Sequence, residues 1–227
     1  MSAASRAGPA AAASGPRIAA VAFDIGGVLL DWDPRHLYRK LIADEREMER
    51  FLGEVCTLEW HAAHDRGTPL EESCARLAAA RPEHAELIWA WARRSEEMVA
   101  GPIEGCVEIL RELLGRGVPC YAVTNMEAET YPLRLERYEF MRWFCGTVVS
   151  SAEGVAKPDP ELFRRLLDRF GLTAQATLLI DDSEPNVRAA RALGLRTHRF
   201  RSPQGLRRRL CREGLLAPAP AAGRHLR

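Results

Sequence analysis

The sequence lacks the features that mark secreted, membrane and polyanion-binding proteins. Its six cysteines include no C-x-x-C pair and have no histidines beside them at metal-ligand spacing, which argues against a zinc site and a disulfide scaffold. No apolar run approaches the roughly 20 residues of a membrane-spanning helix. A net charge of +1 creates no global field that would attract nucleic acid or an anionic membrane. We therefore expect a cytoplasmic protein with a small-molecule ligand and neither nucleic acid nor membrane as a partner.

The two ends of the chain differ in composition from the remainder. Residues 1–16 are rich in Ala, Gly, Pro and Ser, and they lack the strongly apolar segment of a signal peptide. We expect a disordered leader there and a flexible tail over residues 216–227. The hydrophobic fraction of 47% is sufficient for a sizeable buried core between them.

Short apolar runs alternate with helical patterns along most of the chain. Runs at residues 18–23, 118–123, 146–150 and 176–180 have the continuous apolar character of strands that are covered on both faces, and a last short strand is expected at 195–200. Between them, apolar residues recur at helical spacing, for example at Ile103, Val107, Leu110 and Leu114. The alternation predicts an α/β fold with a doubly wound parallel sheet of Rossmann-like type.

One long segment interrupts this alternation. Residues 34–100 contain helical patterns but no strand candidate. We therefore predict a helical cap at 34–100, inserted into a core formed by residues 17–33 and 101–215.

Polar residues follow the predicted strands at the points where each strand ends. Ligands of open parallel sheets bind beyond the carboxyl ends of the strands, so these residues are expected to converge on one site. Any one of them alone is explained by a turn or a helix cap, but a purely structural reason for all of them together is hard to find. The residues are Asp24 after the first strand, Thr124 and Asn125 after the second, Lys157 after the third, and Asp181 and Asp182 after the fourth.

These segments together resemble the four motifs of the haloacid dehalogenase superfamily. "AFDIGGVLLDW" resembles the first motif, "AVTN" the second, "KPDPELF" the third and "LLIDDSEPNVRAARALG" the fourth. The order and spacing of all four are specific, and the resemblance covers the chain from Arg17 to about Leu215. It is closest to the phosphatase-like members that carry a helical cap after the first motif, and it implies a Mg²⁺-dependent phosphatase of a small phosphorylated metabolite such as a sugar phosphate.

The resemblance also assigns roles to individual residues. Asp24 is the expected nucleophile, which forms an aspartyl-phosphate intermediate. Asp24, Asp182 and the backbone carbonyl of Gly26 are the expected Mg²⁺ ligands, while Asp181 and Asn186 are expected to hold metal-bound waters or to orient the site. Thr124, Asn125 and Lys157 are expected to bind the phosphoryl oxygens and to offset their charge.

The sequence departs from the phosphatase pattern at Gly26. Phosphatases of this superfamily usually carry a second aspartate at this position, which protonates the leaving group and then activates water. Some similar enzymes, including sugar-1-phosphate phosphatases, carry glycine instead. An acid from elsewhere in the chain is a second explanation, and the candidates near the cap are Asp31, Asp33, Glu59, His61, His64 and Asp65.

Two other functions remain open at this stage. A 2-haloacid dehalogenase would use Asp24 without a metal, but such enzymes replace the acidic pair at Asp181 and Asp182 with small polar residues. A binding protein that retains the fold without turnover is the other alternative. The Mg²⁺-dependent phosphatase is favoured because the acidic pair is present. The oligomeric state cannot be read from the sequence.

Overall fold

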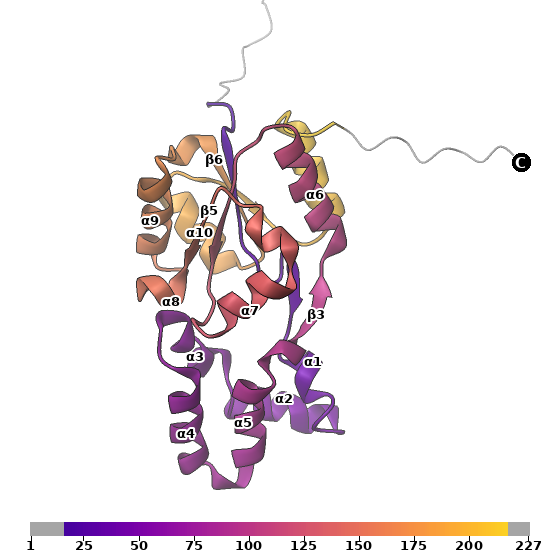
Figure 1. Ribbon diagram of the computed structural model, residues 1–227, viewed down its shortest axis with the longest axis vertical. Helices are drawn as coiled ribbons and strands as arrows, with labels where there is room; N and C mark the ends of the chain where they lie inside the picture. The colour runs from indigo at the N-terminus through magenta and orange to yellow at the C-terminus, as the bar shows by residue number, and fades with distance from the viewer. Residues whose placement is uncertain (1–15, 218–227) are drawn as a thin grey trace, which may run out of the picture.

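A five-stranded parallel sheet forms the centre of the computed structural model, which describes residues 16–217 (Figure 1). The strand order is β5-β4-β1-β6-β7, and every neighbouring pair is parallel. The strands are β1 Ala20–Phe23, β4 Cys120–Thr124, β5 Gly146–Val149, β6 Thr177–Asp181 and β7 Arg196–Arg199. The α/β fold with a Rossmann-like parallel sheet is thus confirmed, and the predicted strands agree with the observed ones to within two residues.

Helices cover both faces of the sheet. Successive residues of each strand point to opposite sides, so each central strand contributes apolar side chains to a core on either face. Val21 and Phe23 of β1 face a core formed with α6 (Glu104–Gly115) and α11 (Pro203–Arg212). Ala22 faces the other core, formed with α9 (Pro160–Phe170) and α10 (Glu184–Ala192). Figure 1 shows α9 and α10 on one side of the strands and α6 on the other. Burial on both sides explains why the three central strands, β4, β1 and β6, read as continuous apolar runs.

The boundaries of α9 follow from ordinary capping chemistry. The Asp159 side chain accepts a hydrogen bond from the backbone N–H of Glu161 at 2.9 Å, and Pro160 occupies the first helical position. Gly171 ends the helix in the left-handed conformation with φ of 62°. These residues therefore account for both ends of the helix.

Three features were not predicted from the sequence. Helix α7 (Thr130–Arg137) and the short helix α8 (Ser150–Glu153) lie in segments without a clear apolar periodicity. A two-stranded antiparallel ribbon pairs β2 (Leu30–Trp32) with β3 (Val99–Pro102). The expectation that residues 34–100 contain no strand was therefore wrong at its end, where β3 begins at Val99. Its four residues include a Gly-Pro pair, so they carry no apolar alternation.

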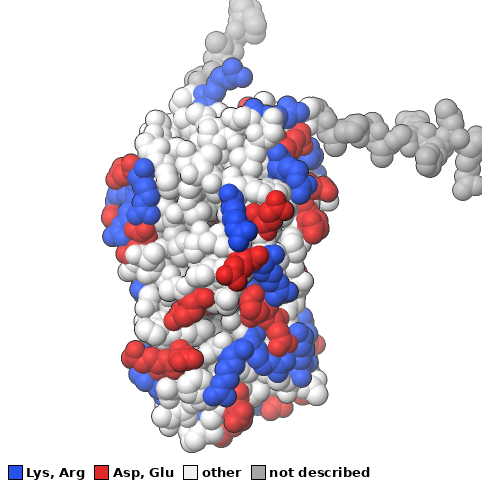
Figure 2. All heavy atoms as spheres, in the orientation of Figure 1, with Lys and Arg blue, Asp and Glu red and all other residues white. Residues whose placement is uncertain are grey.

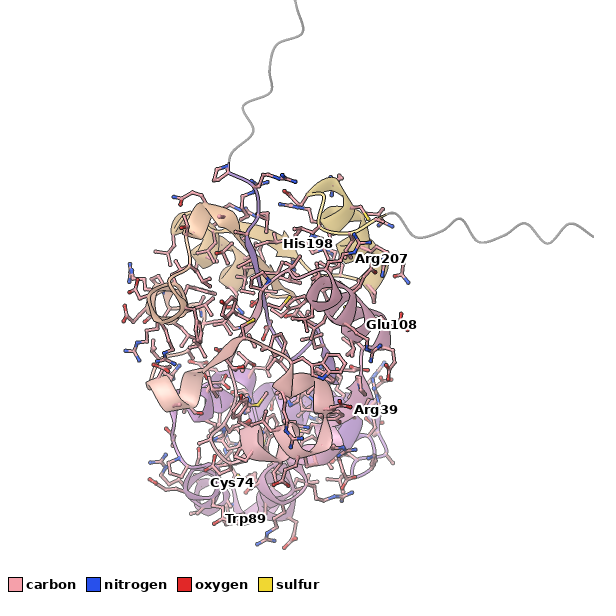
Figure 3. The ribbon with its side chains drawn as sticks, turned by 45° about the horizontal axis from the view of Figure 1, so that its top comes forward. Arg39, Cys74, Trp89, Glu108, His198 and Arg207 are labelled. Carbon is pink, nitrogen blue, oxygen red and sulfur yellow. The ribbon has the colours of Figure 1, made fainter. Side chains whose placement is uncertain are left out.

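Residues between β2 and β3 form a helical unit with its own core. Its helices are α1 Arg35–Tyr38, α2 Glu45–Glu54, α3 Leu58–His61, α4 Leu70–Ala80 and α5 Ala85–Arg93, with 3₁₀ turns η1 His64–Arg66, η2 Pro82–His84 and η3 Ser95–Met98. Buried side chains such as Tyr38, Met48 and Trp91 make up this core, separate from the two on the sheet. The unit lies below the sheet in Figure 1, with Cys74 and Trp89 at its far end in Figure 3. The exact division at residues 33/34 and 100/101 stays a prediction.

The remaining 3₁₀ turns of the core, η4 Glu139–Arg142 and η5 Ala174–Ala176, precede β5 and β6. Within residues 16–217, every helix is too short or too polar to traverse a lipid bilayer. All six cysteines lie in this described part and are free, and four of them are buried. Figure 2 shows acidic and basic side chains intermingled on one face, in keeping with the small net charge. The predicted leader and tail fall almost entirely outside the described residues.

Candidate active site

A cleft of about 760 Å³ lies where the carboxyl ends of the central strands meet the helical unit. The strand order reverses at β1, which is the position where open α/β sheets bind ligands. Core residues in the wall of the cleft include Asp24, Gly26, Asn125, Lys157, Asp182 and Asn186. The structure therefore brings together side chains from all four strand ends that the sequence singled out.

Lys157 is the centre of a buried ion cluster. Its Nζ lies 2.7 Å from Oδ2 of Asp24 and 2.8 Å from Oδ2 of Asp181, and its side chain is almost completely buried. Asp24 follows β1, whereas Asp181 is the last residue of β6, the neighbouring strand. The ammonium group therefore bridges two carboxylates that parallel pairing places at the same edge of the sheet.

Burial and charge oppose one another in this cluster. Burial raises the pKa of Asp24 to about 8, with Lys157 lowering it and the carboxylates of Asp181 and Asp182 raising it further. Burial disfavours the charge on Lys157, but Asp181 and Asp24 outweigh burial and raise the pKa of the ammonium group above its ordinary value. Lys157 is thus a permanent cation, and the site needs more positive charge before all three carboxylates are stable as anions.

Asp181 is fixed by a full set of hydrogen-bond donors. Its Oδ1 accepts from the backbone N–H of Ser183 at 2.9 Å and from Nδ2 of Asn186 at 3.0 Å, and its other oxygen contacts Lys157. Asp182 is exposed by comparison, although partial burial and the charge of Asp181 raise its pKa. Asn186 therefore holds the carboxylate of Asp181 in place, and its expected role in orienting the site stays a prediction.

Asn125 and Thr124 occupy different positions in the site. The Asn125 side chain holds the backbone of Lys157, since its Nδ2 donates to the Lys157 carbonyl at 3.0 Å and its Oδ1 accepts from the Lys157 N–H at 2.8 Å. Thr124 is the last residue of β4 and is fully buried, and its hydroxyl donates to the Asn125 carbonyl at 3.3 Å. Direct binding of phosphoryl oxygens by these two residues stays a prediction.

The acidic residues fit the requirements of a divalent cation. Asp24, Asp181 and Asp182 each offer a carboxylate oxygen, and these oxygens lie within 4.8 Å of one another. Gly27 has φ of 72°, and a Cβ atom there would lie 2.6 Å from Oδ2 of Asp182. The backbone therefore turns tightly under this carboxylate, in a way that only glycine permits. An all-oxygen donor set of this kind suits Mg²⁺.

The position that a side chain of residue 26 would occupy is open. A Cβ atom there would meet only Cβ of Trp32, at 3.9 Å. The backbone of Gly26 forms an isolated bridge with Leu30 and contributes to the wall of the cleft. The missing aspartate thus leaves open space beside Asp24.

The wall contributed by α3 and η1 carries two of the predicted substitute acids. His61 and Asp65 line the cleft, and both are at least nine-tenths buried. His64 is fully buried behind them, and its Nδ1 lies 3.3 Å from Nδ1 of His61. Burial lowers the pKa of His64 to about 4, and the charge of His61 lowers it further, so His64 is neutral.

The other candidates are differently placed. Asp31 is exposed and pairs with His36 at 3.1 Å, and Glu59 is exposed outside the cleft wall. Asp33 lines the cleft, but its Oδ1 accepts from the backbone N–H of Arg35 at 2.8 Å and contacts the Arg35 guanidinium.

Sequence reasoning missed Glu127, which lies on the core side of the cleft. Its Oε1 is 3.4 Å from Nε2 of His61, and its Oε2 accepts from the hydroxyl of Thr130 at 2.7 Å. The only signal in the sequence is its position two residues after Asn125. The contact joins the helical unit to the core across 66 residues of chain, so no local pattern marks it.

Comparison with known proteins identifies a family and several similar phosphatases. The family model described as haloacid dehalogenase-like hydrolase matches residues 18–194. The sesquiterpene phosphatase astK of Aspergillus oryzae is 31% identical over 78% of this chain and 86% of its own length. The phosphorylated carbohydrates phosphatase of Thermotoga maritima is 24% identical over 78% of this chain and 82% of its own.

Solved structures share the fold. A HAD-like family hydrolase from Porphyromonas gingivalis superposes with a TM-score of 0.65 at 18% identity, over 87% of this chain and 99% of that one. A HAD family enzyme from Bacteroides thetaiotaomicron, crystallised with magnesium and inorganic phosphate, gives a TM-score of 0.60 at 20% identity, over 82% and 95% of the two chains.

Proposed function

We propose that this chain, which belongs to the haloacid dehalogenase-like hydrolase family, is a Mg²⁺-dependent phosphatase of a small phosphorylated metabolite. One observation carries the proposal: Asp24, Asp181 and Asp182 present oxygens within 4.8 Å of one another, beside the ammonium group of Lys157. Such a cluster repels anions unless cations offset its charge, and it suits a phosphate dianion once they do. The phosphatases among its relatives support this reaction class.

In the proposed reaction, a carboxylate oxygen of Asp24 attacks phosphorus and the bond to the organic oxygen breaks. Water then attacks the phosphorus of the aspartyl-phosphate, which releases inorganic phosphate and restores the Asp24 carboxylate. Lys157 offsets charge on the phosphoryl oxygens, and Asn125 holds its backbone in place. Mg²⁺ held by Asp24, Asp182, the Gly26 carbonyl and Asp181 would supply the remaining positive charge.

The cleft also bears on the organic part of the substrate. Leu52, Cys56 and Leu58 line it from the helical unit, and Leu58 is 63% exposed. The arginines in its wall are paired, Arg35 with Glu49 at 2.7 Å and Arg134 with Glu96 at 3.2 Å. This lining favours an uncharged, partly apolar group, such as the isoprenoid group that the name of the A. oryzae relative implies. A sugar phosphate is the second substrate class, supported by the carbohydrate phosphatase relative.

A phosphate-release assay tests the reaction class. The panel contains an aryl phosphate, sugar phosphates, a prenyl phosphate and 2-chloropropionate, each with Mg²⁺ and with EDTA. We expect Mg²⁺-dependent phosphate release that falls by about 10³-fold or more in Asp24→Asn. Asp31→Asn, an exposed carboxylate on β2, is the matched control and is expected to retain activity. Halide release that persists in EDTA would contradict the proposal and favour the dehalogenase alternative.

A further inference from the structure

The wall of the cleft opposite the core carries a buried carboxyl group that the reaction described above does not use. Asp65 lies in η1, is 8% exposed and lines the same cleft as Asp24. Its Oδ1 is 3.9 Å from Nε2 of His61, whose ring stacks on Trp32 of β2 with 5.4 Å between centroids. The same Nε2 is 3.4 Å from Glu127 of the core. His61 therefore lies between one carboxyl group of the helical unit and one of the core.

The turn that carries Asp65 packs directly on the core. Gly67, which ends the turn, has φ of 94°, and a Cβ atom there would lie 3.0 Å from the backbone oxygen of Ser151 in α8. The neighbouring Ser150 accepts a hydrogen bond from the Met126 N–H at 3.1 Å. Helix α8 leads directly into the segment that ends at Lys157. Asp65 is thus positioned by contact with the chain segments that form the site.

The surroundings of Asp65 favour a carboxyl group that keeps its proton to a higher pH than an ordinary aspartate does. Burial raises the pKa of Asp65 to about 6, and the charge of Glu127 raises it further. Electrostatic interactions with His61, Lys157 and Arg66 act in the opposite direction and lower the pKa. Asp65 and Lys157 both line this cleft, and the Lys157 ammonium group contacts the nucleophile Asp24.

We propose that Asp65 protonates the leaving-group oxygen, the role left vacant at Gly26. The inference rests on the proposed phosphatase function. As Asp24 bonds to phosphorus, the bond from phosphorus to the organic oxygen breaks, and the Asp65 proton passes to that oxygen to release an alcohol. The Asp65 carboxylate then takes a proton from the water that attacks the aspartyl-phosphate. Phosphate leaves, Asp24 is restored, and Asp65 regains its proton.

Leaving-group dependence tests this role. An aryl phosphate releases a weakly basic oxygen that departs without protonation, whereas an alkyl phosphate releases a strongly basic one that needs a proton. With Mg²⁺ present, we expect Asp65→Asn to lower kcat/KM for the alkyl phosphate by about 10²- to 10⁴-fold and for the aryl phosphate by a much smaller factor. Glu59→Gln removes an exposed carboxylate nearby and is expected to change neither value.

Two outcomes would overturn the inference: equal losses on both substrates, or no loss on either, in a variant whose circular dichroism and thermal unfolding match the wild type. If Asp65→Asn does not fold, the wild-type pH profiles decide instead. The alkyl phosphate rate is expected to fall as pH rises above about 6 while the aryl rate does not, and identical profiles would contradict the role. Wild-type protein that releases no phosphate from any substrate would instead disprove the phosphatase function itself.

Discussion

The side chain of Asn125 makes two hydrogen bonds to the backbone of Lys157, of 3.0 Å and 2.8 Å. The residue that follows β4 therefore fixes the backbone of the lysine that follows β5. The bonds resemble those between paired strands, but they are made by a side chain. They fix where the Lys157 side chain begins, and this side chain must reach both Asp24 and Asp181.

Replacement of Asn125 by alanine is expected to reduce both stability and turnover. Loss of two hydrogen bonds costs about 1 to 3 kcal/mol in the free energy of unfolding. Displacement of Lys157 lowers kcat/KM by up to about 10²-fold, because small misplacements at a reacting centre are costly. Urea unfolding and steady-state kinetics measure the two effects. An unfolding free energy equal to that of the wild type would show that the bonds contribute nothing.

Adjacent glycines beside the nucleophile are expected to respond differently to alanine. Gly27→Ala places a methyl group 2.6 Å from Oδ2 of Asp182 at a positive φ, so we expect a loss of about 1 to 3 kcal/mol and weaker Mg²⁺ binding. Gly26→Ala meets only Trp32, at 3.9 Å, and is expected to change stability by less than about 1 kcal/mol. Denaturant unfolding and calorimetric titration with Mg²⁺ compare the pair. Similar results for the two variants would contradict the tight turn under Asp182.

The open space at Gly26 predicts that an acid can be installed there. Gly26→Asp is expected to fold, and in the Asp65→Asn background to raise kcat/KM on an alkyl phosphate by about 10-fold or more. Gly26→Asn has nearly the same shape but cannot donate a proton to the leaving group as an acid does. Equal rates for the two double variants would show that any effect at this position is steric.

His64 and Asp65 are expected to give opposite pH dependences of stability. Burial lowers the pKa of His64 from 6.5 to about 4, so the folded protein gains stability as pH rises from 4 to 6.5, where only the unfolded chain is protonated. Burial raises the pKa of Asp65 from 3.8 to about 6, so the folded protein loses stability as pH rises between these values. The two contributions partly cancel in the wild type.

Single variants separate these contributions. Between pH 4 and 6, the slope of the free energy of unfolding against pH is expected to be more negative in His64→Phe than in the wild type. In Asp65→Asn the same slope is expected to be more positive than in the wild type. Urea unfolding at intervals across this range measures both slopes. Identical slopes in all three proteins would show that neither group changes its protonation on folding.

The sequence predicted the central sheet well because each buried strand is a short apolar run, and the motif residues Asp24, Lys157 and Asp182 lie at the strand ends in the cleft wall. Segments held by long-range contacts were not predictable in this way. The ribbon of β2 and β3 pairs residues about 70 positions apart and has no apolar alternation.

The same limit applies to the wall of the cleft that faces Asp24. Trp89 and Trp91 are large aromatic residues of the helical unit, yet both lie outside the cleft wall. Leu58, His61 and Asp65 form part of it instead. Which side of a short helix faces a site depends on how it packs on another part of the chain, and helical spacing alone does not encode that.

The β2–β3 ribbon brings the two ends of the helical unit to neighbouring points. The Asp33 N–H donates to the Met98 carbonyl at 2.9 Å, and Trp32 pairs with Val99. A short hairpin turn in place of residues 33–98 would therefore join β2 to β3 without stretching either strand, and the two cores on the sheet would keep nearly all their members. The core therefore keeps the nucleophile and the acidic pair whichever segment joins β2 to β3. Replacement of residues 33–98 by a different segment would change only the part of the cleft wall that this helical unit contributes.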